Sequence, residues 1–155
     1  MPGKKASRGL ARPNCDQPVG PITFGISNDC HLGTEGLGKL VEHNVDLAAY
    51  LARRCAEAPD FDVVPEVPDL SVVCFRHLPD GWARWSEDAV DDYQTRLQRA
   101  LEVGGEAWVS TTVLRDRTFL RAGVVNYLST QEDVDRLLAA LRRHSEGVLE
   151  ELHLR

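Results

Sequence analysis

Two β-rich runs lie close together in the second half of the chain and limit its fold more than any other feature. Residues 107–114 read AWVSTTVL, residues 118–125 read TFLRAGVV, and only three residues separate them. Runs rich in β-branched and aromatic residues with so short a connection predict an antiparallel hairpin. A parallel pair would need a much longer crossover connection. The sequence therefore predicts a sheet that is mostly antiparallel.

Two further strand candidates precede this hairpin. Residues 61–65 (FDVVP) are a short candidate, and residues 71–76 (SVVCFR) are a continuous apolar run. Such a run is typical of a central strand that is buried on both faces. A weaker candidate, residues 21–26 (PITFGI), contains Gly25, which disfavours a strand. The positions expected to face inward or to lie centrally in the sheet are Val72, Cys74, Val109, Thr111, Leu120 and Val124.

Three segments with apolar residues at helical spacing predict helices over residues 35–57, 87–103 and 130–144. Ser129 and Glu132 are three residues apart, which is the spacing of a capping box at the start of the third helix. Four strands and three helices in this order predict an α+β fold. Its four-stranded, mostly antiparallel sheet is covered by helices.

The chain divides into three parts. Residues 1–33 hold five of the twelve glycines and are expected to be diverged or poorly ordered. Residues 34–145 contain nearly all the periodic pattern and are expected to form the folded small domain. Residues 146–155 form a tail that either extends the last helix or frays.

Charge and cysteine content exclude some classes of function. The net charge of −6 argues against binding nucleic acid or an anionic membrane through bulk charge. No apolar run approaches the ~20 residues that a membrane-spanning helix needs. The four cysteines form no CxxC pair, and no apolar signal-peptide core follows the basic first residues. The expected compartment is the reducing cytoplasm.

Arg121 is the most informative polar residue, because it lies inside an apolar strand between Leu120 and Ala122. A buried guanidinium needs a partner, since an unpaired buried charge is costly. Three interpretations stay open: an internal salt bridge, an edge-strand arginine that reaches solvent, or a fork that binds a planar carboxylate.

Other candidate residues are weaker. Cys30, His31 and His43 could form one corner of a metal site, but a fourth ligand has no natural position, so no metal site is predicted. Trp82 and Trp85 lie on a loop, where they form a partner-binding patch or pack against the sheet.

Three segments in order resemble one known family. They are residues 33–38 (GTEGLG), 69–76 (DLSVVCFR) and 109–126 (VSTTVLRDRTFLRAGVVN). Over about residues 31–144 the chain resembles the C-terminal small domain of pyridoxal-phosphate (PLP)-dependent decarboxylases of group II, the aromatic amino acid and glutamate type. The resemblance implies a fold-type-I carboxy-lyase, usually a dimer, that removes the α-carboxylate of an amino acid.

The resemblance also implies roles for single residues. Arg121 matches the second arginine of the family's "LR…LR" pattern and is the candidate for binding the substrate carboxylate, whereas Arg115 matches the first and is expected to be structural. Schiff-base chemistry needs a lysine in a pocket. The chain has only Lys4, Lys5 and Lys39, none in a His-Lys context like the family's cofactor motif, and Lys39 is expected to be a solvated helix residue.

Two hypotheses follow. In the first, the chain is the C-terminal portion of a PLP-dependent amino acid decarboxylase that lacks the cofactor-binding large domain. It would then bind no PLP and have no activity alone, and its partner would be that large domain or a second copy. In the second, it is a non-catalytic α+β module for binding or oligomerisation.

Overall fold

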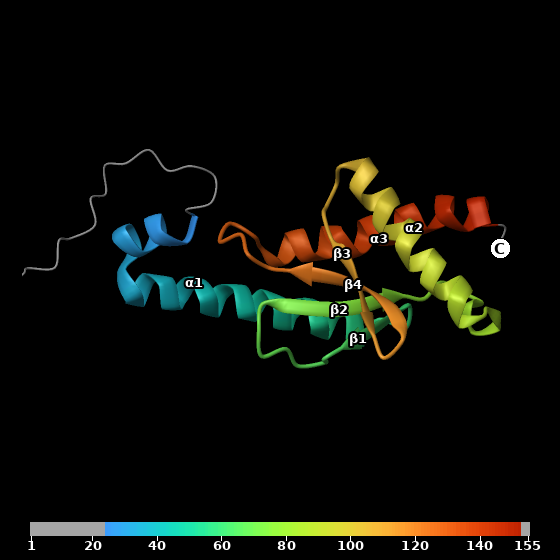
Figure 1. The fold of residues 1–155 in the computed structure, drawn as a ribbon, viewed down its shortest axis with the longest axis horizontal. Coiled ribbons are helices and arrows are strands. Elements are labelled where there is room, and N and C mark those ends of the chain that lie inside the picture. Colours follow the sequence, from blue (N-terminus) through green and yellow to red (C-terminus); the bar gives the residue numbers. More distant parts are fainter. Residues whose placement is uncertain (1–23, 153–155) are drawn as a thin grey trace, which may run out of the picture. The chain divides into compact units, whose positions relative to one another are not determined.

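The computed structural model describes residues 24–152, and residues up to Lys39 form a separate unit from those that begin at Leu40. The elements, shown in Figure 1, are α1 (Phe24–Ala56), β1 (Phe61–Val64), β2 (Val72–His77), the short 3₁₀ helix Trp82–Arg84, α2 (Glu87–Gly104), β3 (Ser110–Leu114), β4 (Arg117–Gly123) and α3 (Gln131–Leu152).

The first unit contains the start of α1. Gly33 interrupts this helix with φ 64° and ψ 179°, and the part after it corresponds to the helix predicted from residue 35. The weak strand candidate over residues 21–26 is not a strand where the structure describes it, because Phe24–Ile26 are helical; its first three residues lie outside the described part. A short apolar run does not distinguish helix from strand. Lys39 is exposed, as expected, and pairs with Glu35 at 2.9 Å.

The second unit contains one antiparallel sheet with strand order β1-β2-β4-β3 (Figure 1). The predicted α+β class and its four-stranded sheet are confirmed. The hairpin between β3 and β4 is tighter than predicted, because Leu114 pairs with Arg117 and leaves a two-residue turn. Arg115 and Asp116 form this turn with φ of 52° and 61°, as a tight hairpin that follows the strand twist requires.

The two faces of the sheet differ. Val73, Phe75 and Leu120 are fully buried among residues of all three helices, while the alternate positions lie on the opposite face, here called the open face. The predictions for Leu120 and Val109 are confirmed, and Val124 packs partly against the core. Val72 is 38% exposed and lies on the open face, so it does not face inward. Thr111 pairs with Leu120 and shares its face, but it is exposed on the edge strand β3 and is not part of the core.

The prediction that residues 71–76 are buried on both faces is also wrong. Val72 is exposed and Cys74 is only half-buried on the central strand β2. A continuous apolar run carries no alternation, so it does not indicate which face of the strand packs against the helices.

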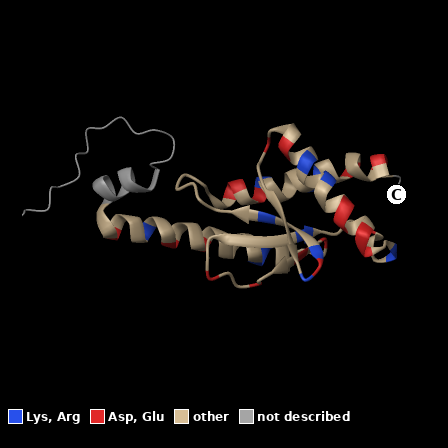
Figure 2. Ribbon diagram, in the orientation of Figure 1, with Lys and Arg blue, Asp and Glu red and all other residues tan. Residues whose placement is uncertain are grey.

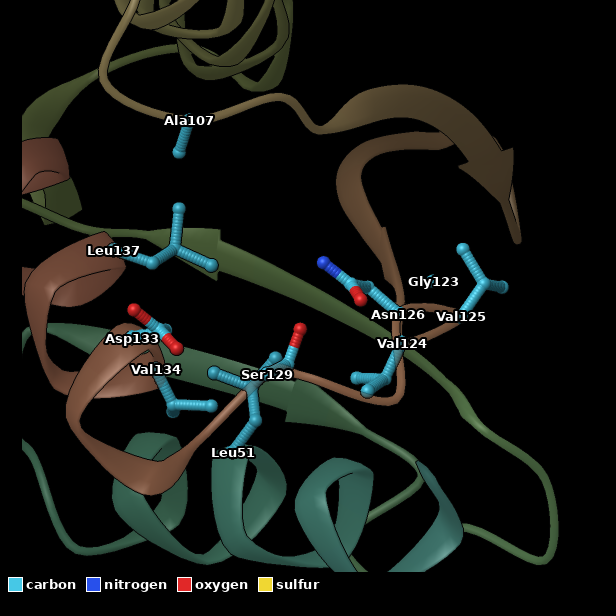
Figure 3. A pocket seen from close by; sticks show the side chains of 10 residues that line it. All are labelled: Leu51, Ala107, Gly123, Val124, Val125, Asn126, Ser129, Asp133, Val134 and Leu137. Atoms are coloured by element: carbon cyan, nitrogen blue, oxygen red, sulfur yellow. The ribbon is translucent and has the colours of Figure 1, made fainter. Parts of the chain in front are cut away.

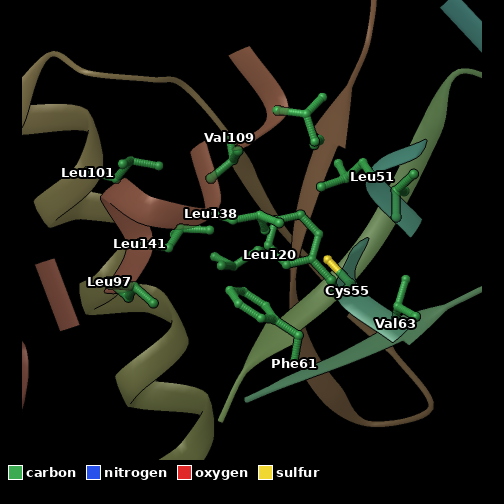
Figure 4. Close-up of a cluster of buried hydrophobic side chains, with 14 of the residues drawn as sticks. Leu51, Cys55, Phe61, Val63, Leu97, Leu101, Val109, Leu120, Leu138 and Leu141 are labelled. Atoms are coloured by element: carbon green, nitrogen blue, oxygen red, sulfur yellow. The ribbon is translucent and has the colours of Figure 1, made fainter. Parts of the chain in front are cut away.

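The core is a cluster of aliphatic and aromatic side chains between the helices and the sheet (Figure 4). Leu51 of α1, Leu97 of α2 and Leu141 of α3 are almost completely buried and meet Leu120 of the sheet there. Each such leucine contributes about 2 kcal/mol through burial of its apolar surface.

The cap of α3 lies one residue later than the sequence suggests. Thr130, not Ser129, caps the helix: its amide donates to Asp133 Oδ2 (2.9 Å), and the Asp133 amide donates to Thr130 Oγ1 (3.4 Å). The Ser129 amide instead donates to the carbonyl of Asn126. The helix continues to Leu152 and buries Val148, so the described part of the predicted tail is helical.

Candidate functional site

Arg121 lies on the open face of the central strand β4. It pairs with Cys74 of β2 on one side and with Ser110 of β3 on the other. Its side chain is exposed, and Nε donates to Ser110 Oγ at 3.1 Å. No carboxylate among the described residues forms an ion pair with it, which leaves the terminal nitrogens of the guanidinium for another group.

The two residues paired with Arg121, Cys74 and Ser110, are uncharged. Cys74 is half-buried beside it, and burial raises the pKa of this thiol while the nearby guanidinium of Arg121 opposes that rise. Across the described elements acidic and basic residues are interspersed (Figure 2). Of the three interpretations that the sequence left open, the internal salt bridge is therefore wrong within the described residues. The arginine reaches solvent from a central strand rather than from an edge.

A small cavity of about 190 Å³ lies at the end of β4, between α1 and the start of α3 (Figure 3). Leu51, Val134 and Leu137 form apolar walls, and Figure 3 shows Asp133 and Asn126 at its polar parts.

The polar groups of this cavity are already engaged in local structure. Asp133 accepts from the Thr130 amide and hydroxyl and from Arg136, and the hydrogen bonds from Thr130 hold its pKa below the usual range. Asn126 Oδ1 accepts from the Leu128 amide. Asp133 is therefore held as the capping residue of α3 and is not free to act as a general base.

Arg76 is a buried charged residue that the sequence reasoning did not single out. It is 2% exposed, and one terminal nitrogen lies 2.6 Å from Glu87 and 3.0 Å from Asp91. Both acids lie in the first turns of α2, so the ion pairs hold this helix against the end of β2. Asp91 also accepts from the amide of Thr118, which ties β4 to the same place.

His77, the next residue, is the centre of a buried polar network. Its Nδ1 lies 2.6 Å from the hydroxyl of Tyr93, which donates to Ser145 Oγ at 2.8 Å. Its backbone amide and carbonyl both bond to the side chain of Gln94. Its Nε2 lies 3.6 Å from Asp60.

Burial sets the protonation of this network. It lowers the pKa of His77 to about 4 and raises the pKa of Tyr93, so both are neutral at pH 7. Arg142 binds Asp60 through two hydrogen bonds of 2.6 and 2.9 Å, and these lower the pKa of that carboxyl. The network joins β2, α2 and α3 and is inaccessible to a substrate, so its role is structural. The one sequence signal for it was the pair Arg76-His77 at the end of an apolar run.

The described residues offer no lysine in a pocket for a Schiff base with PLP. Lys39 is their sole lysine, and it is exposed and paired with Glu35 instead of lying in a pocket. Within the same residues no three His, Cys, Asp or Glu side chains are close enough to hold a metal ion, and none of the helices is long and apolar enough to cross a membrane. His43 Nε2 donates to the carbonyl of Ser129 at 3.0 Å.

The two loop tryptophans differ. Trp82 is 39% exposed. Trp85 packs edge-on against Tyr93, with ring centres 5.5 Å apart, and contacts the core. Trp85 therefore packs against the domain. Of the two tryptophans, only Trp82 is exposed enough to contact a partner.

Comparison with known proteins finds similarity to amino acid decarboxylases. No family model matches the chain. It is 25% identical to an aromatic-L-amino-acid decarboxylase of Bacillus atrophaeus over 116 residues, 75% of this chain and 24% of the relative. The chain is similar to PLP-dependent decarboxylases. It is also 29% identical to tyrosine decarboxylase 2 of Arabidopsis thaliana over 114 residues, 73% of this chain and 20% of the relative.

The decarboxylase-like fold is confirmed by a crystal structure of Oryza sativa TDC with PLP and tryptamine. The TM-score is 0.67 at 24% identity, over 79% of this chain and 26% of that one. The resemblance expected from the three motifs, to the C-terminal small domain of these enzymes, is confirmed. The chain spans about a quarter of the length of the proteins it matches.

Proposed function

We propose that this chain is the C-terminal small-domain portion of a PLP-dependent amino acid decarboxylase. It requires a large domain for PLP and catalysis, and Arg121 binds the substrate carboxylate in the completed site. The observation that carries this proposal is the exposed guanidinium of Arg121, which projects from the centre of the open face without an acidic partner among the described residues. An arginine fork of this kind binds a planar carboxylate through two hydrogen bonds.

The surface expected to contact the large domain includes apolar side chains at one end of the sheet, here called the end patch. The loops before β2 and after β4 are adjacent, since the Val124 amide donates to the carbonyl of Ser71 at 2.8 Å. Exposed apolar residues on them mark an interface with another polypeptide. The end patch consists of Val67, Leu70, Val72, Val125, Tyr127 and Leu128, which are 38–79% exposed.

The chain alone is expected neither to absorb visible light after PLP is added nor to release CO₂ from amino acids. A chimera in which residues 34–152 replace the matching segment of the Bacillus atrophaeus relative should bind PLP and decarboxylate. Arg121→Lys in this chimera keeps the charge but loses the planar fork, so KM should rise roughly ten- to a hundredfold. Arg99→Lys, a change at an exposed arginine of α2, is the control.

Each outcome bears on one part of the proposal. CO₂ release by the chain alone would show that it needs no large domain. A chimera that fails to bind PLP would count against the domain assignment, and an unchanged KM in Arg121→Lys would remove Arg121 from the site. The reducing cytoplasm is the proposed location, which the two described free thiols, Cys55 and Cys74, support.

The alternative function, a non-catalytic oligomerisation module, is favoured by the same end patch, because two copies could bury it against each other. Light scattering tests whether the isolated chain forms such a dimer. A stable dimer that Tyr127→Ser converts to a monomer would support the alternative, whereas a monomer would oppose it.

A further inference from the structure

A second cavity, of about 420 Å³, lies between β1 and the β3–β4 hairpin. This cavity is here called the hairpin pocket. It is lined by Asp62, Val64, Leu114, Arg115, Arg117 and Phe119. Strand pairing places Asp62 beside Arg76 and Val64 beside Cys74, on the open face. The volume falls in the range of small-molecule sites, roughly 300–1,000 Å³.

The floor of the hairpin pocket is apolar and held in place. Phe119 is only 4% exposed although it lies on the open face, and Val64 and Leu114 are half-buried beside it. The guanidinium carbon of Arg76 lies 5.5 Å from the centre of the Phe119 ring. Because Arg76 is itself fixed by two ion pairs, the aromatic floor has little freedom to move.

The rim of the hairpin pocket carries unused charges of both signs. Asp62 and Arg115 are exposed, and neither forms an ion pair or a side-chain hydrogen bond with any residue in the described part of the chain. Arg117 has one long contact there, from Nε to Glu87 at 3.6 Å, and that Glu87 oxygen is already 2.6 Å from Arg76. Two guanidinium groups and one carboxylate are therefore available to a ligand. Residues of both charges gather at this hairpin (Figure 2).

The turn of the hairpin has an unusual backbone for residues with side chains. Arg115 and Asp116 adopt left-handed φ values of 52° and 61°, which glycine and asparagine adopt at lower cost. Here the turn places the Arg115 guanidinium at the rim, a function that glycine could not supply.

We propose that the hairpin pocket binds a free α-amino acid with an apolar side chain. The ligand carboxylate binds Arg115 and Arg117, its ammonium group binds Asp62, and its side chain packs on Val64 and Leu114 above the buried Phe119 ring. A simple anion would leave Asp62 unused, and a simple cation would leave both arginines unused. Arg121 lies on the same face but does not line this pocket, and the site needs no PLP, so the proposal does not depend on the decarboxylase assignment.

The test uses the full chain labelled with ¹⁵N and L-leucine as the probe. Addition of millimolar L-leucine should shift the amide signals of residues 62–64 and 114–119. Two analogues test the zwitterion directly: 4-methylpentanoate lacks the ammonium group, and 3-methylbutylamine lacks the carboxylate. Each should bind at least about tenfold more weakly, because each loses one charge-assisted contact. Glycine, which lacks the apolar side chain, should also bind more weakly.

Two variants complete the test. Arg115→Gln and Asp62→Asn should each weaken L-leucine binding about tenfold or more, and Arg99→Gln should leave it unchanged. No localised shift with L-leucine, or shifts confined to other residues, would overturn the proposal. Equal binding of 4-methylpentanoate, with no effect of Asp62→Asn, would show a simple anion site instead and would overturn it too. None of these results bears on decarboxylation by the chimera, so the two proposals fail separately.

Discussion

Acidification should destabilise this domain through His77. Burial lowers the pKa of His77 from 6.5 to about 4 in the folded chain. The groups that face its ring are Asp60, Arg142, Tyr93 and Phe61, of which Asp60 favours the charged form and Arg142 opposes it. The effect of burial on the pKa of His77 is larger than the effects of Asp60 and Arg142, so the ring stays neutral in the folded state.

The sign follows from proton linkage. Below pH 6.5 the unfolded chain binds a proton at His77 that the folded chain excludes, so the free energy of unfolding falls as the pH falls. The loss begins near pH 6.5 and is complete near pH 4. The interval between these two pKa values corresponds to about 3 kcal/mol. That is a large fraction of the 5–15 kcal/mol typical of a domain.

Urea denaturation at pH 7 and at pH 4.5 measures this loss. Tryptophan fluorescence is a suitable signal, because Trp85 packs against Tyr93, which contacts His77. His77→Gln removes the titrating group, so most of the difference between the two pH values should disappear in this variant. His43→Gln is the matched control, since His43 is half-buried and hydrogen-bonded to a backbone carbonyl.

Two results would refute this reasoning. One is a free energy of unfolding that stays constant between pH 7 and pH 4.5 in the unmodified chain. The other is the same pH dependence in His77→Gln as in the unmodified chain. If His77→Gln does not fold, NMR titration of the His77 ring in the unmodified chain decides, because a pKa above 6 would contradict the burial effect.

Three further predictions concern the cap, the core and the thiols. Thr130→Ala should cost about 1 kcal/mol of stability by urea denaturation, because it removes the cap of α3, whereas Ser129→Ala should cost much less. Leu120→Ala should cost about 2–5 kcal/mol in the same assay, since Leu120 is completely buried on a central strand; a cost below 1 kcal/mol would contradict its place in the core. Cys55 is buried and burial raises its pKa to about 12, so peptide mapping after thiol alkylation at pH 8 should find Cys55 unmodified while half-buried Cys74 reacts.

Local patterns in the sequence were sufficient to predict most of the fold. The short connection between residues 114 and 118 required an antiparallel hairpin, and the 3.6-residue spacing located the helices within a few residues. The three motifs also identified the decarboxylase-like fold. Arg121 drew attention because a charge in an apolar strand is rare, and the structure places it in solvent.

The tertiary structure alone decided which side chains are buried and what they contact. In residues 71–76 both faces are apolar, so the sequence could not show that Val73 and Phe75, rather than Val72 and Cys74, pack against the helices. The burial of Arg76 and His77 depends on groups brought from other elements, such as Glu87 of α2 and Ser145 of α3. A local pattern records the geometry of one element, whereas burial and pKa depend on the neighbours that the fold assembles around a residue.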